Sequence, residues 1–285
     1  MAISNSTDLN DLVGQIVAKD AISAAYGARV MRNIVSVYEV PLGAGSIVVP
    51  RFSGLTEGAL TEGTATTSTT WGSDGVTLTP VERGIYVQIS KRVLHADPFA
   101  DLSPYGEQLG RALAVGEDTA ILAIMGSGVW STTAQGTLGV DISGGIFRGA
   151  IAELEAQNAP KPYFAVLAPQ SWAKMINEFG NASVFDGVGA GIVQGFGEGM
   201  PSLNGYVGAP YGIPTFISTA VPVGGTANRY NVMFSKQAVA YGYMKDIGVD
   251  VFDNVTARAF DIMAWRSAHQ GIINAAYGVT MYDKY

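Results

Sequence analysis

The sequence predicts an α+β protein in which strand-rich regions come before and after a compact α/β unit. Three observations support this class. Strand-like segments are frequent up to residue 90 and again after residue 230, a long helical pattern covers residues 102–125, and residues 130–230 alternate between helical and strand patterns. The 285 residues are sufficient for one large domain or two closely joined ones.

The composition favours a chain that hides much of its surface in an assembly. Hydrophobic residues make up 48% of the chain and charged residues only 14%, below the roughly 25% of typical soluble proteins. The formal net charge is −7 and Lys and Arg do not cluster, so specific nucleic-acid recognition is not expected. The lack of cysteine excludes disulfides and thiolate metal sites. With no membrane-length apolar run and no secretory signal pattern, we expect a soluble protein made in the cytoplasm.

The first part of the chain predicts an arm followed by strands. Residues 1–30 are expected to form an N-terminal arm with a polar start and a short helix. Residues 34–50 and 76–90 are rich in Val, Ile and other strand formers. In the second of these segments, one face of the strand is expected to carry Ile85, Val87 and Ile89, and the other Tyr86, Gln88 and Ser90.

The stretch between these strands, "RFSGLTEGALTEGTATTSTTWGSDG", predicts an extended ribbon over about residues 48–80. It is too polar to be core, yet its Thr residues and its single Trp favour strands over linkers. Its tandem "LTEGA" and "LTEGT" has an odd offset, which predicts a bend near Gly58 or Gly63. An isolated two-stranded hairpin is marginal in water, so this ribbon needs another surface to rest on.

The clearest helical pattern lies at residues 102–125, with Ser103 as the N-cap and Pro104 at the first helical position. We expect Glu117 and Asp118 to lie on its outer faces. Three glycines either mark the close approach of a sheet or ribbon, or are tolerated in a plain core helix: Gly106, Gly110 and Gly116.

The remaining elements alternate and then become strands only. Helices are expected at 142–158 and 170–179, strands at 161–169 and 213–222, a Gly-rich passage at 186–212, and several strands from 230 to 285.

A search for catalytic chemistry yields no site. His95 and His269 lie in no metal-binding pattern, and the Gly-rich "GAGIVQGFG" lacks the third glycine of a dinucleotide loop. "SWAK" matches the acylating pair S-x-x-K without its K-T-G strand, so Ser171 is expected to cap a helix. We therefore expect no catalytic residue, cofactor or metal. Four acidic residues near the C-terminal strands are expected on a solvated or inter-subunit face: Asp246, Asp250, Asp253 and Asp261.

The order of these parts resembles a known family. After the arm come "SIVVPRFSGLTEGALTEGTATTSTTWGSDGVTLTPVERGIYVQISKRVL", the helix "DLSPYGEQLGRALAVGEDTAIL", and then "YFAVLAPQSWAKM", "YGIPTFISTAVP" and "DVFDNVTARAFDIMAWRSAHQGIINA". This arrangement is similar to that of the tailed-bacteriophage major capsid protein family, which has the Hong Kong 97-type fold. The resemblance covers nearly the whole chain.

The resemblance implies a division of the chain. An N-terminal arm at 1–30 precedes the first part of a peripheral domain at 31–129, which holds the extended loop and the spine helix. An axial domain at 130–230 follows, and residues 231–285 complete the peripheral domain and return to the axial one.

The resemblance also implies function and partners. The chain would assemble with itself into pentamers and hexamers of an icosahedral shell, in the host bacterial cytoplasm, and enclose double-stranded DNA without binding it specifically. A scaffolding protein, a portal and a decoration protein are the expected partners, and the virion is the expected location. Candidate subunit-interface residues are Arg51, Leu55, Glu57, Leu60, Glu62, Trp71, Asp253, Asn254 and Arg258.

Two alternatives stay open. An encapsulin-type compartment shell would share the fold but house a protein cargo. A secreted carbohydrate-binding or adhesive β-rich protein would fit the Thr, Gly and Tyr content and the acidic residues near the C-terminus.

The composition of the ribbon generates one prediction. Some members of the family that this chain resembles cross-link their shells by an isopeptide bond between a Lys of the extended loop and an Asn of a neighbouring subunit. No Lys occurs between Arg51 and Ser90, although Asn254 lies in the acceptor region. We expect mature particles to give intact monomer bands on a denaturing gel, and a ladder of covalent multimers would refute this.

Overall fold

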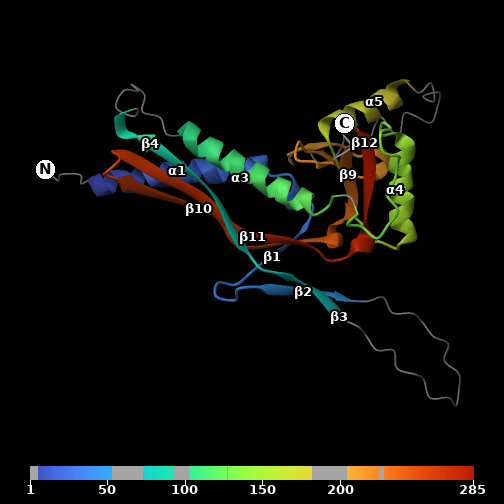
Figure 1. Cartoon of the computed structure of the whole chain (residues 1–285), viewed down its shortest axis with the longest axis horizontal. Coiled ribbons are helices and arrows are strands. Elements are labelled where there is room, and N and C mark those ends of the chain that lie inside the picture. Colours follow the sequence, from blue (N-terminus) through green and yellow to red (C-terminus); the bar gives the residue numbers. More distant parts are fainter. Residues whose placement is uncertain (1–5, 53–72, 93–102, 127, 182–203, 225–227) are drawn as a thin grey trace, which may run out of the picture.

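The computed structural model has two parts and a projecting ribbon (Figure 1). An elongated part holds α1, α3 and a long sheet, and a second part holds α4, α5 and another sheet. The ribbon of β2 and β3 leaves the molecule near the junction of the two. The structure describes residues 6–52, 73–92, 103–126, 128–181, 204–224 and 228–285.

The long sheet joins strands from the two ends of the chain, in the order β1-β10-β11-β4. The first strand runs parallel to its neighbour, whereas the other pairs are antiparallel. Sheets and helices are thus segregated rather than strictly alternating, and the predicted α+β class is confirmed. The strands are β1 (Ser36–Glu39), β4 (Val81–Ser90), β10 (Val239–Asn254) and β11 (Ala259–Ile272).

Two helices cover one face of this sheet (Figure 1). They are α1 (Ser6–Ala28) and α3 (Ser103–Ala123). Leu109 and Leu113 of α3 pack on Ile262 in one buried cluster, where the inward residues of β4 also contribute. The predicted alternation of β4 is confirmed, because Ile85, Val87 and Ile89 face the helices while their neighbours are exposed.

α1 and α3 approach each other closely, and glycines make this possible. A Cβ at Gly106 would stand 2.8 Å from the carbonyl oxygen of Val17, and one at Gly110 would overlap the carbonyl oxygen of Ala21. Gly116 has open space around it. The interpretation of Gly106 and Gly110 as contacts with a sheet or ribbon was therefore wrong, because their neighbour is a helix, whereas Gly116 fits the alternative of a tolerated glycine. That helix spans 23 residues and is longer than the short helix expected in the arm.

The second part contains a six-stranded sheet in the order β12-β9-β5-β7-β6, with β8 beside β9. All five residues of the central β5 are buried, as expected for the strand at 161–169. Phe147 of α4 and Met175 of α5 lie in one buried cluster with β5, β9 and β12. The elements are α4 (Gly144–Ala156), β5 (Tyr163–Leu167), α5 (Pro169–Asn181), β6 (Tyr206–Gly208), β7 (Thr215–Ile217), β8 (Val223–Gly224), β9 (Asn228–Ser235) and β12 (Gly278–Lys284).

Polar residues are buried inside this second part. Ser171 does not cap a helix, as the sequence suggested, because α5 begins two residues earlier and the side chain is fully buried. Its hydroxyl donates to Asp283 over 2.6 Å and accepts from Asn231. Lys174 and Arg229 lie 3.0 and 3.5 Å from the same carboxylate. The S-x-x-K match is therefore part of a network that fixes β12 to α5.

The two parts share one core. Met31, Ile121 and Tyr241 of the elongated part are buried in the same cluster as Phe164 and Phe234 of the six-stranded sheet. The two parts are therefore held together, because separating them would expose this apolar cluster to water.

The helix contact predicts a contrast between two alanine substitutions. Gly110→Ala places a methyl group on the backbone of α1, whereas Gly116→Ala places the same group in open space. Both gain the same helix propensity, so we expect the first variant to be less stable than the second by about 1–3 kcal/mol. Urea denaturation of the unassembled chain measures the difference, and equal stabilities would contradict the close contact.

Candidate assembly surfaces

The described part of the ribbon is a two-stranded sheet whose base contacts the body (Figure 1). β2 (Ile47–Phe52) pairs with β3 (Ser73–Leu78) in an antiparallel register. Arg51 is half-exposed, with its Nη2 3.7 Å from Oδ2 of Asp74, an exposed ion pair worth little. The other predicted ribbon residues lie outside the described residues, namely Leu55, Glu57, Leu60, Glu62 and Trp71, and so does the expected bend.

The base of the ribbon is seated against two glycines of the long sheet. Leu78 is fully buried, and Val76 is partly buried beside it. A Cβ at Gly271 would stand 2.6 Å from Cγ1 of Val76, and one at Gly242 would stand 2.9 Å from Cδ1 of Leu78. Val76 and Leu78 therefore occupy the space that a side chain at Gly242 or Gly271 would fill. This packing fixes where the ribbon leaves the body.

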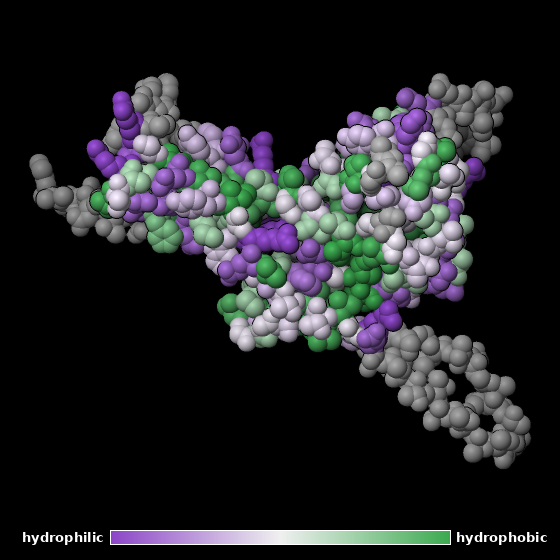
Figure 2. All heavy atoms as spheres, viewed as in Figure 1, coloured by the Kyte–Doolittle hydropathy of each residue, from purple (hydrophilic) through white to green (hydrophobic). Residues whose placement is uncertain are grey.

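The opposite face of the ribbon is apolar and open. Val48 alternates with the inward Ile47 and Val49, and 60% of its surface is exposed. Nearby, the turn between β1 and β2 exposes Leu42 almost completely, and Figure 2 shows apolar residues, coloured green, at this turn. Such side chains fit a surface that another protein covers.

The long sheet has a second uncovered surface, on the side away from α1 and α3. We call it the open face, defined by Tyr86, Asp250, Phe252, Met263 and Trp265. In register, Met263 lies between Tyr86 and Asp250 across three strands. Phe252 is 64% exposed and Tyr86 is 60% exposed. Aromatic residues and methionine are enriched at protein interfaces, so this face has the composition of a contact surface.

The polar groups on this side of the sheet, which include Gln88 and Asp261, are already bonded to one another. Gln88 donates to Asp261 over 2.8 Å, and Trp265 donates through Nε1 to Asp250 over 2.6 Å. The hydrogen bond from Gln88 is the main reason that the pKa of Asp261 is lowered. The face is therefore held in one arrangement before any partner arrives, which reduces the entropic cost of binding. These two aspartates are bonded within the sheet rather than freely solvated.

Three predicted interface residues lie together at the tip of the β10–β11 hairpin. Asp253 pairs with Lys91 at 2.6 Å. Asn254 donates to Asp261 over 3.0 Å and accepts from the backbone of Ala257. Arg258 is exposed and has φ of 49°, and its carbonyl oxygen accepts from the backbone nitrogen of Lys91. Arg51 lies on the ribbon instead, so the predicted residues fall on two separate surfaces.

The sequence pattern does not predict the apolar members of the open face as interface residues. Neither Phe252 nor Met263 belongs to a catalytic or charged pattern. The signal was the alternation in "GVDVFDN", where Val249 and Val251 turn inward and Asp250 and Phe252 turn outward.

Within the described parts of the chain, no group of three or more His, Asp or Glu side chains is placed to hold a metal ion. His269 is partly buried in β11, and His95 lies outside the described residues. No helix that the structure describes is long and apolar enough to cross a bilayer.

A long sheet with one helical face, an α/β part and a projecting ribbon is the architecture of shell-forming capsid proteins. The chain is similar to the capsid of cyanophage P-SCSP1u, with 16% identity, a TM-score of 0.65, and coverage of 90% of this chain and 88% of that chain. It is also similar to a structure of Mycobacterium phage Che8, with 16% identity, a TM-score of 0.63, and coverage of 89% of this chain and 90% of that chain. A third similar structure is the virus-like particle from Pyrococcus furiosus, with 10% identity, a TM-score of 0.62, and coverage of 93% of this chain and 97% of that chain.

A family model described as "Phage capsid protein" matches residues 75–279, and the chain belongs to this family. The predicted Hong Kong 97-type fold is confirmed by the solved structures. The expectation that the protein is not an enzyme is confirmed too, because the family and fold are those of structural proteins. The family indicates the virion as its location. No match was found among curated protein sequences.

The base of the ribbon predicts a stability difference between two positions of the ribbon. Leu78→Ala removes a fully buried side chain and leaves a cavity between two glycines, so we expect a loss of about 2–5 kcal/mol. Val48→Ala removes exposed atoms and should change stability by about 0.5 kcal/mol or less. Urea denaturation of both unassembled variants checks this, and a loss at Leu78 no larger than at Val48 would show that the base is not anchored.

Proposed function

We propose that this capsid protein builds the icosahedral shell of a tailed bacteriophage with a double-stranded DNA genome. The observation that carries the proposal is that one chain has two uncovered surfaces, the apolar side of the ribbon and the open face. Two different surfaces that fit each other on successive subunits make a heterologous contact, which forms a ring when the rotation between subunits closes. Pentamers and hexamers are the rings that an icosahedral shell needs.

In this proposal the ribbon of one subunit rests on the open face of its neighbour. The open face supplies aromatic and sulfur-containing side chains for the apolar side of the ribbon. Exposed Lys245, which lies opposite Ser267 at its margin, is a candidate partner for Glu57 and Glu62. The hairpin tip at 253–258, with exposed Val255, is the candidate contact where three capsomers meet.

The division of the chain follows the same proposal. The long sheet with α1 and α3 would be the peripheral domain, built from residues 31–129 and 231–285, with residues 1–30 as its arm. Within 231–285, β12 and the end of β9 return to the sheet of the other domain. The part with α4 and α5 would be the axial domain, from 130 to 230, whose loops meet at the ring centres. Its Gly-rich passage at 186–212 lies mostly outside the described residues.

The charge of the chain suits a shell that holds DNA without binding it. The net charge of −7 gives an overall repulsion of phosphate. Assembly would take place in the host cytoplasm, with a separate scaffolding protein, a portal and a decoration protein as partners.

A compartment shell with a protein cargo is the second candidate. The observation in its favour is that the virus-like particle from Pyrococcus furiosus matches across 97% of its own length. Negative-stain microscopy and nucleic-acid extraction of particles from infected or induced cells separate the two. DNA-filled particles support the phage shell, and particles filled with one host protein support the compartment.

The proposed contact predicts an assembly defect. Phe252→Ser removes an exposed aromatic anchor of the open face, and losing such an anchor costs about 2 kcal/mol or more of contact energy. We expect the concentration needed for assembly to rise by at least about tenfold, as measured by sedimentation velocity. Val115→Ser, an exposed apolar position on the helical side, is the matched control and should assemble normally. Assembly of the Phe252 variant at the wild-type concentration would refute the contact.

A further inference from the structure

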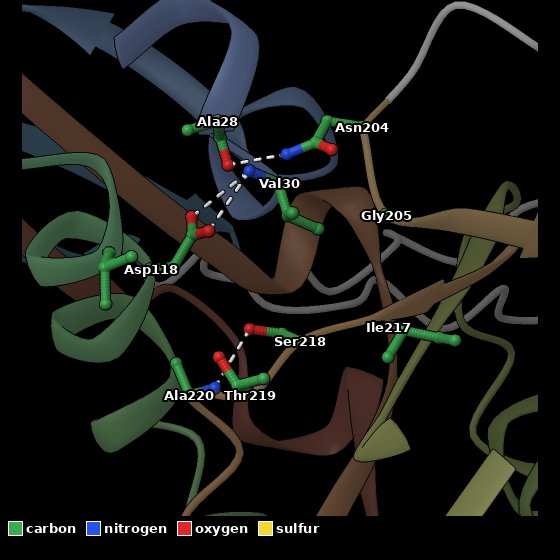
Figure 3. A pocket seen from close by; sticks show the side chains of 10 residues that line it. Ala28, Val30, Asp118, Asn204, Gly205, Ile217, Ser218, Thr219 and Ala220 are labelled. Carbon is green, nitrogen blue, oxygen red and sulfur yellow. Dashed lines mark hydrogen bonds between the residues drawn. The ribbon is translucent and has the colours of Figure 1, made fainter. Parts of the chain in front are cut away.

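The C-terminal end of α1 is held at a joint with α3 and the second part of the chain (Figure 3). Oδ1 of Asp118, on α3, accepts from the backbone nitrogen of Met31 over 2.9 Å, and Oδ2 accepts from that of Val30 over 3.1 Å. From the other side, Asn204 donates to the carbonyl oxygen of Ala28 over 2.7 Å. The carboxyl group of Asp118 thus fixes the turn by which the chain leaves α1.

This joint buries charge that the sequence placed on the surface. Glu117 is fully buried and Asp118 is 5% exposed, so the expectation that both lie on outer faces of the helix was wrong. Arg29 explains the burial of Glu117, with its Nε 3.1 Å from Oε2. The same guanidinium lies 2.5 Å from Asp246 on β10.

Asp118 differs from the other two carboxylates because it touches only neutral donors. The ion pairs in the described part of the joint engage Glu117 and Asp246, and none engages Asp118. The charged and titratable groups facing the joint are Tyr26 on α1, Arg29 and Arg32 after α1, Glu117 on α3, Tyr241 and Asp246 on β10, and Arg266 on β11.

A cavity of about 200 Å³ lies beside Asp118 (Figure 3). Val30 and Ile217 form apolar walls, and the exposed Asn204 and Thr219 line its margin toward solvent. A proton therefore has a path to the buried carboxyl group without unfolding of the joint.

We propose that Asp118 makes the docking of α1 depend on protonation. When the buried carboxyl group takes up one proton, its cost of burial falls, and the joint holds the end of α1 more firmly against α3. The remaining carbonyl oxygen of the protonated group still accepts from Met31, so the turn keeps its backbone bond.

The pKa of Asp118 agrees with this geometry. Burial raises it to about 6, the carboxylate of Glu117 adds to the rise, and the two backbone hydrogen bonds act in the opposite direction. A carboxyl group whose pKa is raised on folding stabilises the folded form below its ordinary pKa, and this stabilisation is lost as the pH rises through about 6. Burial alone would also raise the pKa of Asp246, but hydrogen bonds from Arg29 and Tyr26 lower it to about 2, so its charge is constant over this range.

Hydrogen exchange tests the proposal on assembled particles. Protection of backbone amides in the C-terminal half of α1 is compared at about pH 5 and about pH 7.5, after correction for intrinsic rates. We expect roughly tenfold greater protection at the lower pH, the factor that a pKa of about 6 in place of 3.8 produces. Amides of α4, which does not contact the joint, serve as the internal reference and should not show this ratio.

Two variants assign the effect. Asp118→Asn keeps the shape but cannot titrate, so the ratio should fall to about one. Asp141→Asn removes an exposed carboxylate that pairs with Lys174 away from the joint, and it should keep the wild-type ratio. Equal protection of wild-type α1 at both pH values, or an unchanged ratio in D118N, overturns the proposal. If D118N chains do not fold, the wild-type chain alone tests the proposal. The measurement is then the ratio of amide protection at the two pH values in α1, compared with the same ratio in α4.

Discussion

The structure depends on one constraint, which is that the helices among the described residues cover one face of the long sheet and leave the other face open. α1 and α3 bury Val17, Leu109 and Ile262 on that side, and the other side keeps Phe252 and Tyr86 in contact with solvent. A sheet covered on one face is stable as part of a subunit, but its aromatic surface is costly to leave exposed. The ribbon has the same property at smaller scale, with a buried base and an open apolar side. The incomplete burial of the isolated chain is what makes association favourable.

Rigidity at the junction gives this incomplete burial a defined geometry. One apolar cluster spans both sheets, and the ion pairs around Arg29 tie α1, α3 and β10 together next to it. Val76 and Leu78 pack the base of the ribbon against glycines of β10 and β11. Both uncovered surfaces are therefore fixed relative to one framework, and a curved shell needs such fixed angles between contacts.

Much of the fold could be predicted from the sequence because its strongest signals are local. The alternation of β4, the long α3 and the buried β5 follow from periodicity and composition alone. The failures share a non-local cause. Glu117 and Asp118 were assigned to the surface because charged residues usually lie there, and their burial depends on Arg29 and Val30, which are distant in sequence. The glycines of α3 signalled a close approach, but α1 was underestimated because small residues, such as Ala21 and Ala25, form its buried side. The open face could not be recognised before β4, β10 and β11 were known to be neighbours.

The pairing of the long sheet also sets the order in which a new chain becomes competent. β1 pairs with β10 at Ser36 and Ala240, about 200 residues apart, and β4 pairs with β11 across a comparable distance. Contacts of such high sequence separation close late in folding. A ribosome must therefore release nearly the whole polypeptide before the aromatic surface exists. Truncated translation products lack this surface, so they cannot make any contact that depends on it.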